Sequence, residues 1–365
     1  MTRCRAAVVG FAIAVSLAIG TGSLRLAAAA ADALPSRLTD EEFWRLSEEM
    51  SESDGYFRSD NLLSNELYYP EVIAPLMARV KPGRVYLGVG PEQNFNYIAA
   101  IKPKMAFITD IRRGNLHAQL MYKALFELSA DRAELISRLF TKPRPATLTA
   151  QSSAMAIMQA FWDVDSSAQA EFDRNLAAVV ELLTKTHHLP LSKDDLDGID
   201  YVYRSFYWYG PQMTYNSSSN NSFGRGAMAS YAQLMVATDG GGAPRSFLAS
   251  DESFRVVKDL ESRNLIVPVV GNFGGARALK AVGQYVREHD AVVGAFYLSN
   301  VEQYLVQDGI WDAFCRNVAS MPLDADSTFI RSHSGGAGAF QNALGEMQSE
   351  TRKACGAAEP AGGAR

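Results

Sequence analysis

The segment Arg84–Tyr97 constrains the fold of this chain more than any other part of the sequence. A short apolar run there ends at Gly88 and Gly90, and a helix-like segment follows. A second apolar run, Met105–Thr109, then ends at Asp110. This order of strand, glycine turn, helix and strand is typical of the first half of an open α/β sheet, where glycines let a ligand approach the backbone and an acid after the next strand binds ribose hydroxyls.

The same alternation of apolar runs and helical segments returns after residue 226. Continuous apolar runs are expected for parallel strands that are buried on both faces, and alternating strands and helices favour right-handed crossovers. The predicted fold class is α/β, with a Rossmann-like, open, mostly parallel sheet, helices on both faces and a mainly helical insert. The expected strands are Val85–Val89, Met105–Thr109, Gln233–Thr238, Leu265–Val270, Ala291–Leu298 and Thr328–Arg331.

Five segments follow from this pattern. Residues 1–31 are predicted to be a signal peptide, and residues 32–83 a helical N-terminal segment. Residues 84–345 form the predicted α/β domain, in which residues 129–228 are the helical insert. Residues 346–365 are rich in small residues and are predicted to be a disordered tail.

The first residues have the three parts of a secretory signal. Arg3 and Arg5 precede the uncharged apolar run Ala6–Gly20, and Ala27–Ala31 offers small-residue cleavage sites. The run is shorter than the roughly 20 residues that span a bilayer. We therefore expect a periplasmic or secreted protein, and an uncleaved membrane anchor is the alternative.

Charge and cysteine content narrow the expected partners. The formal net charge is −5, and the sequence contains no Lys/Arg cluster that would make part of the surface positive. No nucleic-acid partner is therefore expected. Cys and His spacing shows no metal pattern, and no metal is predicted. In an oxidising compartment Cys315 and Cys355 could pair, and one buried thiol with one tail thiol is the alternative. A small-molecule ligand is the expected partner, and the sequence leaves the oligomeric state open.

In an open parallel sheet, ligands bind beyond the carboxyl ends of the strands. The residues at or just after the predicted strand ends are therefore the candidates for ligand contact. Those proposed to bind a cofactor are Gly88, Gly90, Glu92, Asp110, Ile111, Asn272 and Phe273, and those proposed to act in catalysis are Tyr297, Ser299 and Asn300.

Each candidate has a structural alternative. Gly88 and Gly90 could simply form a tight strand-to-helix turn, and Asp110 could cap a helix or pair with a neighbouring arginine. A carboxylate at Glu92 would repel a pyrophosphate but would tolerate a cationic ligand such as S-adenosylmethionine. Asn272 could contact an adenine amine or only form a turn before two glycines.

The end of the longest predicted apolar strand, Ala291–Leu298, usually faces the reacting atom in this kind of fold. Tyr297, Ser299 or Asn300 could orient a nucleophile, with Glu302 as a base, or the segment could be a helix N-terminus with Glu302 near its positive end. The aromatic run Tyr201–Tyr209 could stack on a ligand or pack in the core. His117 could face the same crevice or be a satisfied histidine. Hydrolase and phosphoryl-transfer motifs do not occur.

Four segments together resemble an uncharacterised bacterial, exported protein family whose fold is similar to that of class I S-adenosylmethionine-dependent methyltransferases. The resemblance extends over roughly residues 50 to 335, and it is carried by four motifs that are specific for the family: Leu87–Phe95, Ile108–Asn115, Pro268–Gly275 and Phe296–Leu305. It implies that Gly88 and Gly90 form the glycine loop, that Asp110 is the ribose acid and that Asn272 lies beside the adenine. S-adenosylmethionine is the implied cofactor.

The chain also departs from the methyltransferase pattern. The acid near the start of the first strand is missing, the strand-end acid expected at position 272 is an amide, and a large insert separates the two halves.

Two hypotheses of different class follow. The first is a methyltransferase-like protein that binds S-adenosylmethionine or a similar nucleoside and is an S-adenosylmethionine-dependent transferase, with the reaction unassigned. The second is an exported, non-catalytic ligand-binding or scaffold protein on a degenerate methyltransferase fold, because S-adenosylmethionine is made in the cytoplasm and an exported protein would meet little of it.

Overall fold

A six-stranded sheet forms the centre of the computed structural model, which describes residues 33–217, 228–334 and 340–354. The strand order is β3-β2-β1-β4-β5-β6, and all neighbours are parallel except β6, which runs antiparallel to β5. The order reverses between β1 and β4, so the loops after these strands leave the sheet in different directions. The strands are β1 (Val85–Gly88), β2 (Met105–Asp110), β3 (Ile266–Val270), β4 (Val293–Ser299), β5 (Thr328–Ser334) and β6 (Phe340–Glu346).

Helices cover both faces of the sheet, and the alternation of side chains along the strands shows which helix lies on which face. Tyr86 on β1 donates a hydrogen bond to Asn94 on α3 (Gln93–Ile101). Phe107 on β2, which points the other way, packs edge-on against Tyr285 on α11 (Ala278–Glu288), with ring centroids 5.6 Å apart.

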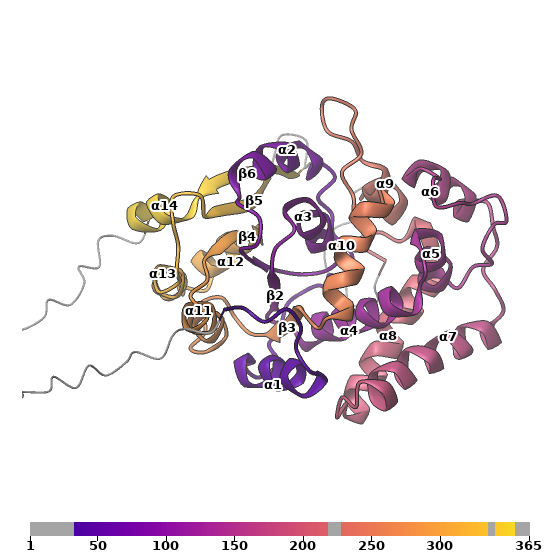
Figure 1. Ribbon diagram of the computed structural model, residues 1–365, viewed down its shortest axis with the longest axis horizontal. Helices are drawn as coiled ribbons and strands as arrows, with labels where there is room; N and C mark the ends of the chain where they lie inside the picture. The colour runs from indigo at the N-terminus through magenta and orange to yellow at the C-terminus, as the bar shows by residue number, and fades with distance from the viewer. Residues whose placement is uncertain (1–32, 218–227, 335–339, 355–365) are drawn as a thin grey trace, which may run out of the picture. The chain divides into compact units, whose positions relative to one another are not determined.

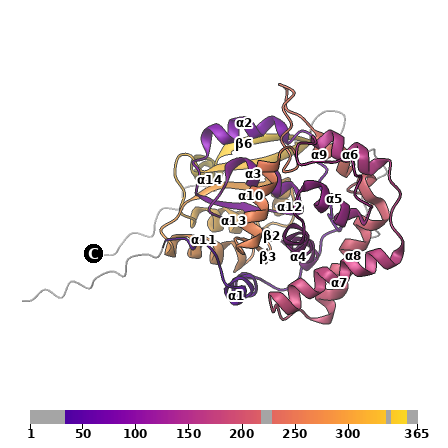
Figure 2. The ribbon, with the colours of Figure 1, turned by 45° about the vertical axis from the view of Figure 1, so that its right-hand side comes forward.

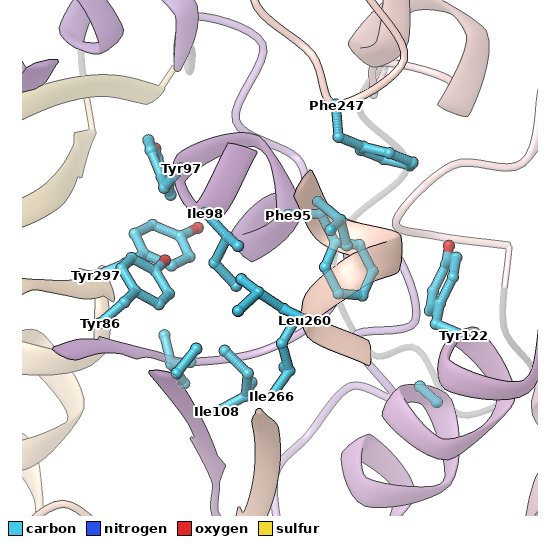
Figure 3. Packing of buried hydrophobic residues seen from close by; sticks show 14 of the residues in the cluster. Tyr86, Phe95, Tyr97, Ile98, Ile108, Tyr122, Phe247, Leu260, Ile266 and Tyr297 are labelled. Atoms are coloured by element: carbon cyan, nitrogen blue, oxygen red, sulfur yellow. The ribbon is translucent and has the colours of Figure 1, made fainter. Parts of the chain in front are cut away.

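Contacts between helices complete the two layers. One layer contains α2 (Pro70–Arg79), α3, α4 (Arg113–Leu128) and α10 (Asp251–Ser262), and the other contains α1 (Asp40–Met50), α11, α12 (Val301–Gln307) and α13 (Trp311–Ala319). The core between sheet and first layer is aromatic: Figure 3 shows Tyr86, Tyr97 and Tyr297 close together, with Phe95, Tyr122 and Phe247 beyond them.

Residues 129–217 are mainly helical. Figures 1 and 2 both show their helices grouped on one side of the sheet. They are α5 (Arg132–Phe140), α6 (Ala154–Trp162), α7 (Gln169–Glu181), the π-helical turn η1 (Leu182–Thr186), α8 (Lys193–Tyr209) and the 3₁₀ turn η2 (Gly210–Gln212). None of the helices in the described part of the chain has the length and apolarity needed to cross a membrane.

Three expectations about elements were wrong or incomplete. The segment Gln233–Thr238, predicted as a strand, belongs mostly to helix α9 (Tyr231–Val236), because Ser230 and Gln233 form a capping box that starts a helix. β6 was not predicted, because its polar sequence lacks the apolar pattern of a buried strand.

The first part of the segment predicted as a disordered tail is a helix. Residues 347–354 form helix α14 (Met347–Ala354), with Met347 fully buried and Glu350 paired with Arg331 at 2.5 Å. Residues 355–365 and the predicted signal peptide lie outside the described residues. Cys315 on α13 is buried and belongs to a disulfide bond. The other two cysteines, Cys4 and Cys355, lie outside the described residues.

His187, just after η1, links the insert to the rest of the molecule. Its Nδ1 lies 2.8 Å from Asp40 on α1, and its Nε2 lies 2.8 Å from Glu127 on α4. The hydrogen bond with Glu127 raises the pKa of His187 above 6.5, and the contact with Asp40 adds to this effect. The charged imidazolium therefore stabilises the folded state.

We expect His187→Gln to lower the free energy of unfolding by about 1 kcal/mol at pH 6, since two hydrogen bonds to charged groups are weakened. Because the folded pKa is raised, this contribution is fully present below pH 6.5 and is lost as the pH rises through the folded pKa. Urea unfolding from pH 5.5 to 9 checks this. The difference between wild type and variant should shrink with rising pH, and His289→Gln, whose ring contacts Tyr285 on its own helix, is the control. A pH-independent difference would contradict the assignment.

Candidate functional site

A cavity of about 370 Å³ lies beyond the carboxyl ends of β1, β2, β3 and β4, and we call it the strand-end cavity. The loops after these strands form its floor. Part of its wall comes from residues 56–66, which precede α2, and part from α12, including Tyr304. A second hollow of about 570 Å³ lies between α1 and α11, but it contains no strand end and is lined partly by the exposed ion pair Arg45–Glu49. The strand-end cavity is therefore the better candidate.

Eight of the ten residues proposed from the sequence line this cavity. They come from the ends of four strands that are distant in sequence but adjacent in the sheet: Gly90, Asp110, Ile111, Asn272, Phe273, Tyr297, Ser299 and Asn300. Gly88 and Glu92 are not among the lining residues.

Gly88 has a packing role. A Cβ atom at this position would lie 1.8 Å from Asn94 Oδ1 and 2.9 Å from Tyr86 Cε1. The side chain of Asn94 occupies the space because it donates to the carbonyls of Val89 and Gly90 (2.9 and 3.1 Å) and accepts from Tyr86. Gly88 is thus required by the strand-to-helix turn itself, which was the alternative to a role in ligand binding. Gly90, with φ +75°, does line the cavity.

Glu92 is buried behind the cavity wall. Both of its carboxylate oxygens lie 3.3 Å from the backbone nitrogen of Ser64. Burial raises the pKa of Glu92 to about 8, and the nearby Glu66 adds to the rise, while the N–H of Ser64 opposes it. Glu92 is therefore mostly uncharged at pH 7, and the electrostatic argument for a cationic ligand that was based on this residue no longer holds.

Asp110 ends β2 with its side chain at the cavity. Its Oδ1 accepts from the backbone N–H of Arg112 at 3.0 Å, and Arg112 Nε lies 3.6 Å away. Among the described residues Oδ2 has no hydrogen-bond partner. Burial raises the pKa of Asp110, although the positive charge of Arg112 opposes the shift.

Asn272 lies in the loop after β3 and is held as a turn residue. Its Oδ1 accepts from the N–H of Gly274 at 2.9 Å, and its backbone N–H donates to Glu52 at 3.1 Å. Glu52 also accepts from the first N–H groups before α11, so it caps that helix from a distant part of the chain. The Nδ2 group of Asn272 has no hydrogen-bond partner among the residues that the structure describes.

Glu66 is the site residue that the sequence did not reveal. It is 1% exposed and lines the cavity. Its Oε1 accepts from the hydroxyls of Tyr297 (2.8 Å) and Ser299 (2.5 Å), and its Oε2 accepts from Asn342 Nδ2 at 2.6 Å. Burial raises the pKa of Glu66, whereas the hydrogen bonds from Ser299, Asn342 and Tyr297 lower it by less. Nothing near Glu66 in the sequence indicates that it folds onto residues more than 200 positions away.

Ser299 ends β4 in a left-handed backbone conformation, with φ +50°. The pairing of β4 with β5 shifts register between Tyr297 and Ser299, so that Ser299 turns toward Glu66. A non-glycine residue in this conformation is strained and often marks a functional position. Asn300 follows as the residue before α12.

The remaining sequence candidates lie elsewhere. Glu302 forms an ion pair with Arg331 at 2.7 Å and does not line the cavity. In the aromatic run 201–209, Tyr203 and Phe206 are buried in the core, whereas Trp208 and Tyr209 are exposed. None of the run lines the cavity, so the core interpretation holds for part of the run only. His117 is bound to Asp195 at 3.0 Å and does not line the cavity either.

Part of the aromatic wall comes from two residues far apart in sequence. Phe57 and Tyr304 pack edge to face with ring centroids 5.1 Å apart, and Arg58 Nη2 donates to the Tyr304 hydroxyl at 3.2 Å. This wall gives a bound planar or cationic group an apolar surface. In the described parts of the chain no group of three or more His, Cys, Asp or Glu is arranged to hold a metal ion.

The family model described as Domain of unknown function (DUF7790) matches residues 62–352, which include every strand of the sheet. The chain belongs to this family. A comparison with curated proteins finds no match. The DUF7790 domain contains Glu66 and all the strand ends of the cavity, whereas Tyr56, Phe57, Arg58 and Asn61 precede it. Membership in a family without an assigned reaction agrees with the sequence-based expectation, and it carries no statement about methyl transfer.

Proposed function

We propose that the strand-end cavity binds S-adenosylmethionine or a similar nucleoside ligand on a Rossmann-like, methyltransferase-like sheet. One observation carries the proposal: Gly90, Asp110 and Asn272 follow three neighbouring strands, β1, β2 and β3, and all three line one cavity. In α/β sheets whose strand order reverses, this crevice is the usual place of a ligand. The antiparallel last strand on an otherwise parallel sheet also fits this class of fold.

The neighbouring strands suggest how the ligand lies. Asp110 lines the cavity, and its Oδ2 has no hydrogen-bond partner among the described residues, so the carboxylate can accept both hydroxyls of a ribose. The base would then extend toward Asn272 and Phe273 at the end of β3. The 5′ substituent would extend the other way, past Gly90 toward Ser299, since strands lie about 4.8 Å apart.

If the protein is a transferase, the donor and acceptor meet near the end of β4, where Tyr297, Ser299 and Asn300 line the cavity. Methyl transfer is a displacement in which the protein mainly positions two reactants. A second candidate function is ligand binding without turnover in an exported protein. This second function is favoured because the two carboxylates near the end of β4 already have partners and are not free to act as a base. Glu66 accepts three hydrogen bonds, and Glu302 is paired with Arg331.

Export itself remains a proposal, which rests on the apolar segment Ala6–Gly20 and on the disulfide bond at Cys315. Disulfide bonds persist mainly in oxidising compartments. A processed protein in the periplasmic or secreted fraction would support the binding function, and an unprocessed cytoplasmic protein would support the transferase.

The ribose contact gives a sharp binding test. We expect S-adenosylmethionine and S-adenosylhomocysteine to bind the wild-type protein, and Asp110→Ala to weaken binding about tenfold or more, which corresponds to about 1.4 kcal/mol. Adenosine should also bind more tightly than 2′,3′-dideoxyadenosine, and this preference should disappear in the variant. Isothermal titration calorimetry measures both quantities.

Asp312→Ala, at an exposed position on α13, is the control and should bind as wild type does. Absence of binding of either sulfur nucleoside to folded wild-type protein at millimolar concentration would refute the proposal. Equal binding by the Asp110 variant would remove the assigned role of that residue.

A further inference from the structure

The hydrogen bonds around Glu66 fix the polarity of one end of the strand-end cavity. The hydroxyl groups of Tyr297 and Ser299 both point to the same carboxylate oxygen, at 2.8 and 2.5 Å. Each hydroxyl has one hydrogen atom, and an ionised carboxylate only accepts. When Glu66 is ionised, both hydrogens are therefore directed at it, and the oxygen atoms have only lone pairs left for other partners.

These two hydroxyl-bearing residues line the cavity. We propose that Glu66 orients Tyr297 and Ser299 as hydrogen-bond acceptors, so that this end of the cavity binds a ligand group that donates hydrogen bonds, namely an ammonium or hydroxyl group. The assignment is independent of the nucleoside proposal, because it concerns the β4 end of the cavity and follows from Glu66 and its partners alone. Glu66 acts here as a positioning residue.

Among the described residues, the surroundings of Glu66 provide hydrogen bonds rather than a counter-charge. The groups that face it from the packed elements are Tyr297 and Ser299 on β4, Asn342 on β6, Ser332 on β5, Tyr86 on β1, Tyr97 on α3 and the carboxyl group of Glu92. These are neutral groups or a second acid. A ligand ammonium at the two hydroxyls would be the nearby positive charge that favours the ionised carboxyl.

The backbone holds this arrangement in place. Ser299 has a left-handed conformation that a serine rarely adopts, and the orientation of its side chain toward Glu66 offsets that strain. Asn342 fixes the second oxygen of Glu66 from the antiparallel strand β6. The carboxyl group therefore cannot rotate to offer an oxygen directly to the ligand without breaking one of these bonds.

Exchange of the acid for its amide is expected to invert the polarity. In Glu66→Gln the amide oxygen would face Asn342 Nδ2, because two NH₂ groups cannot bond to each other. The amide NH₂ would then donate to the hydroxyls of Tyr297 and Ser299, whose hydrogens would turn toward the cavity. The variant should therefore favour an acceptor ligand.

Two small probes measure this preference by ligand-observed NMR titration at pH 7.5: ethanolamine, which donates through both of its polar groups, and acetate, which only accepts. We expect wild type to bind ethanolamine at least tenfold more tightly than acetate, and Glu66→Gln to lose or reverse that ratio. Glu261→Gln, which changes an equally buried acid on α10 away from the cavity, is the matched control and should keep the wild-type ratio.

The pH dependence separates positioning from a merely structural role. Ethanolamine affinity of wild type should fall as the pH decreases through the raised pKa of Glu66, because a protonated carboxyl donates to one of the hydroxyls. The Gln variant should lack this dependence. A wild-type protein without preference between the probes, or a Gln variant that keeps the preference for ethanolamine, would overturn the inference. Either result would leave nucleoside binding at Asp110 intact, since that is measured separately.

Discussion

Gly88→Ala is expected to lower the free energy of unfolding by about 3 kcal/mol, at the upper end of the usual range for overpacking a core. The new Cβ would lie 1.8 Å from Asn94 Oδ1, and Asn94 cannot move without losing its bonds to the carbonyls of Val89, Gly90 and Pro91 and to the Tyr86 hydroxyl. The buried polar groups of the first strand-to-helix turn would then lack partners.

Chemical denaturation of wild type and variant measures this effect. Gly309→Ala is the control, because no atom lies within 4 Å of the new Cβ there, so only the backbone strain of its φ of +69°, about 1 kcal/mol, is expected. In an Asn94→Ala background, Gly88→Ala should have a smaller effect, since the nearest atom, Asn94 Oδ1, is gone and only the 2.9 Å contact with Tyr86 Cε1 remains. Simple additivity of the two substitutions would show that the clash is not the cause.

Asp195→Ala is the second change with a large expected effect, again about 3 kcal/mol. Asp195 Oδ1 accepts from Arg113 Nε at 2.6 Å and from His117 Nε2 at 3.0 Å, and Oδ2 accepts from the hydroxyl of Ser192 at 2.7 Å. The residue is 2% exposed, and it connects the start of α8 in the insert to α4 beside the sheet. Its removal would leave a partly buried guanidinium and an imidazole without their acceptor.

The acid dependence of this effect identifies its origin. Burial would raise the pKa of Asp195, but the hydrogen bonds from Arg113, Ser192 and His117 outweigh it and hold the pKa well below its usual range. The contribution is therefore present above the unfolded pKa of about 3.9 and is lost only as the pH falls through the lower folded pKa.

Urea unfolding from pH 7 to pH 3 tests this. The difference between wild type and Asp195→Ala should not shrink between pH 7 and about pH 4, where the loss of the bond to His117 can only add to it. Asp194→Ala, at the exposed neighbouring position in the same helical turn, should change stability by less than about 0.5 kcal/mol. A stability difference for Asp195→Ala that disappeared already near pH 5 would contradict the assigned pKa.

The sequence was most informative where local pattern and sheet geometry act together. The apolar runs that became β1 and β2 end in Gly88 and Asp110, and the rule that parallel strands present their carboxyl ends at one edge was enough to place Gly90, Asp110, Asn272 and Ser299 around one cavity. No distant contact had to be known for this part of the site.

It was least informative where a side chain acts over a long sequence separation. Glu66 meets Ser299 and Asn342, and Glu52 caps α11, but each lies in an irregular segment whose path is decided by tertiary packing. The charge of Glu92 was misjudged for a related reason, because its pKa depends on burial that local sequence does not show. In α9, the capping box at Ser230 outweighed the strand-like composition of the segment.

Helix α1 and the residues that follow it cover one edge of the sheet. β3 is one of the two edge strands of the sheet, and its outward-facing backbone groups are bonded to α1 and to the two residues after it. Ser47 donates to the carbonyl of Pro268, and Ser51 accepts from the N–H of Val270. The N–H of Glu52 donates to the carbonyl of Val270. An uncovered strand of this apolar kind is a template for pairing with another chain. A shortened protein that begins after Glu52 would therefore expose β3 as an unpaired edge strand. We expect the first helix, which precedes the matched family domain, to favour solubility as well as folding.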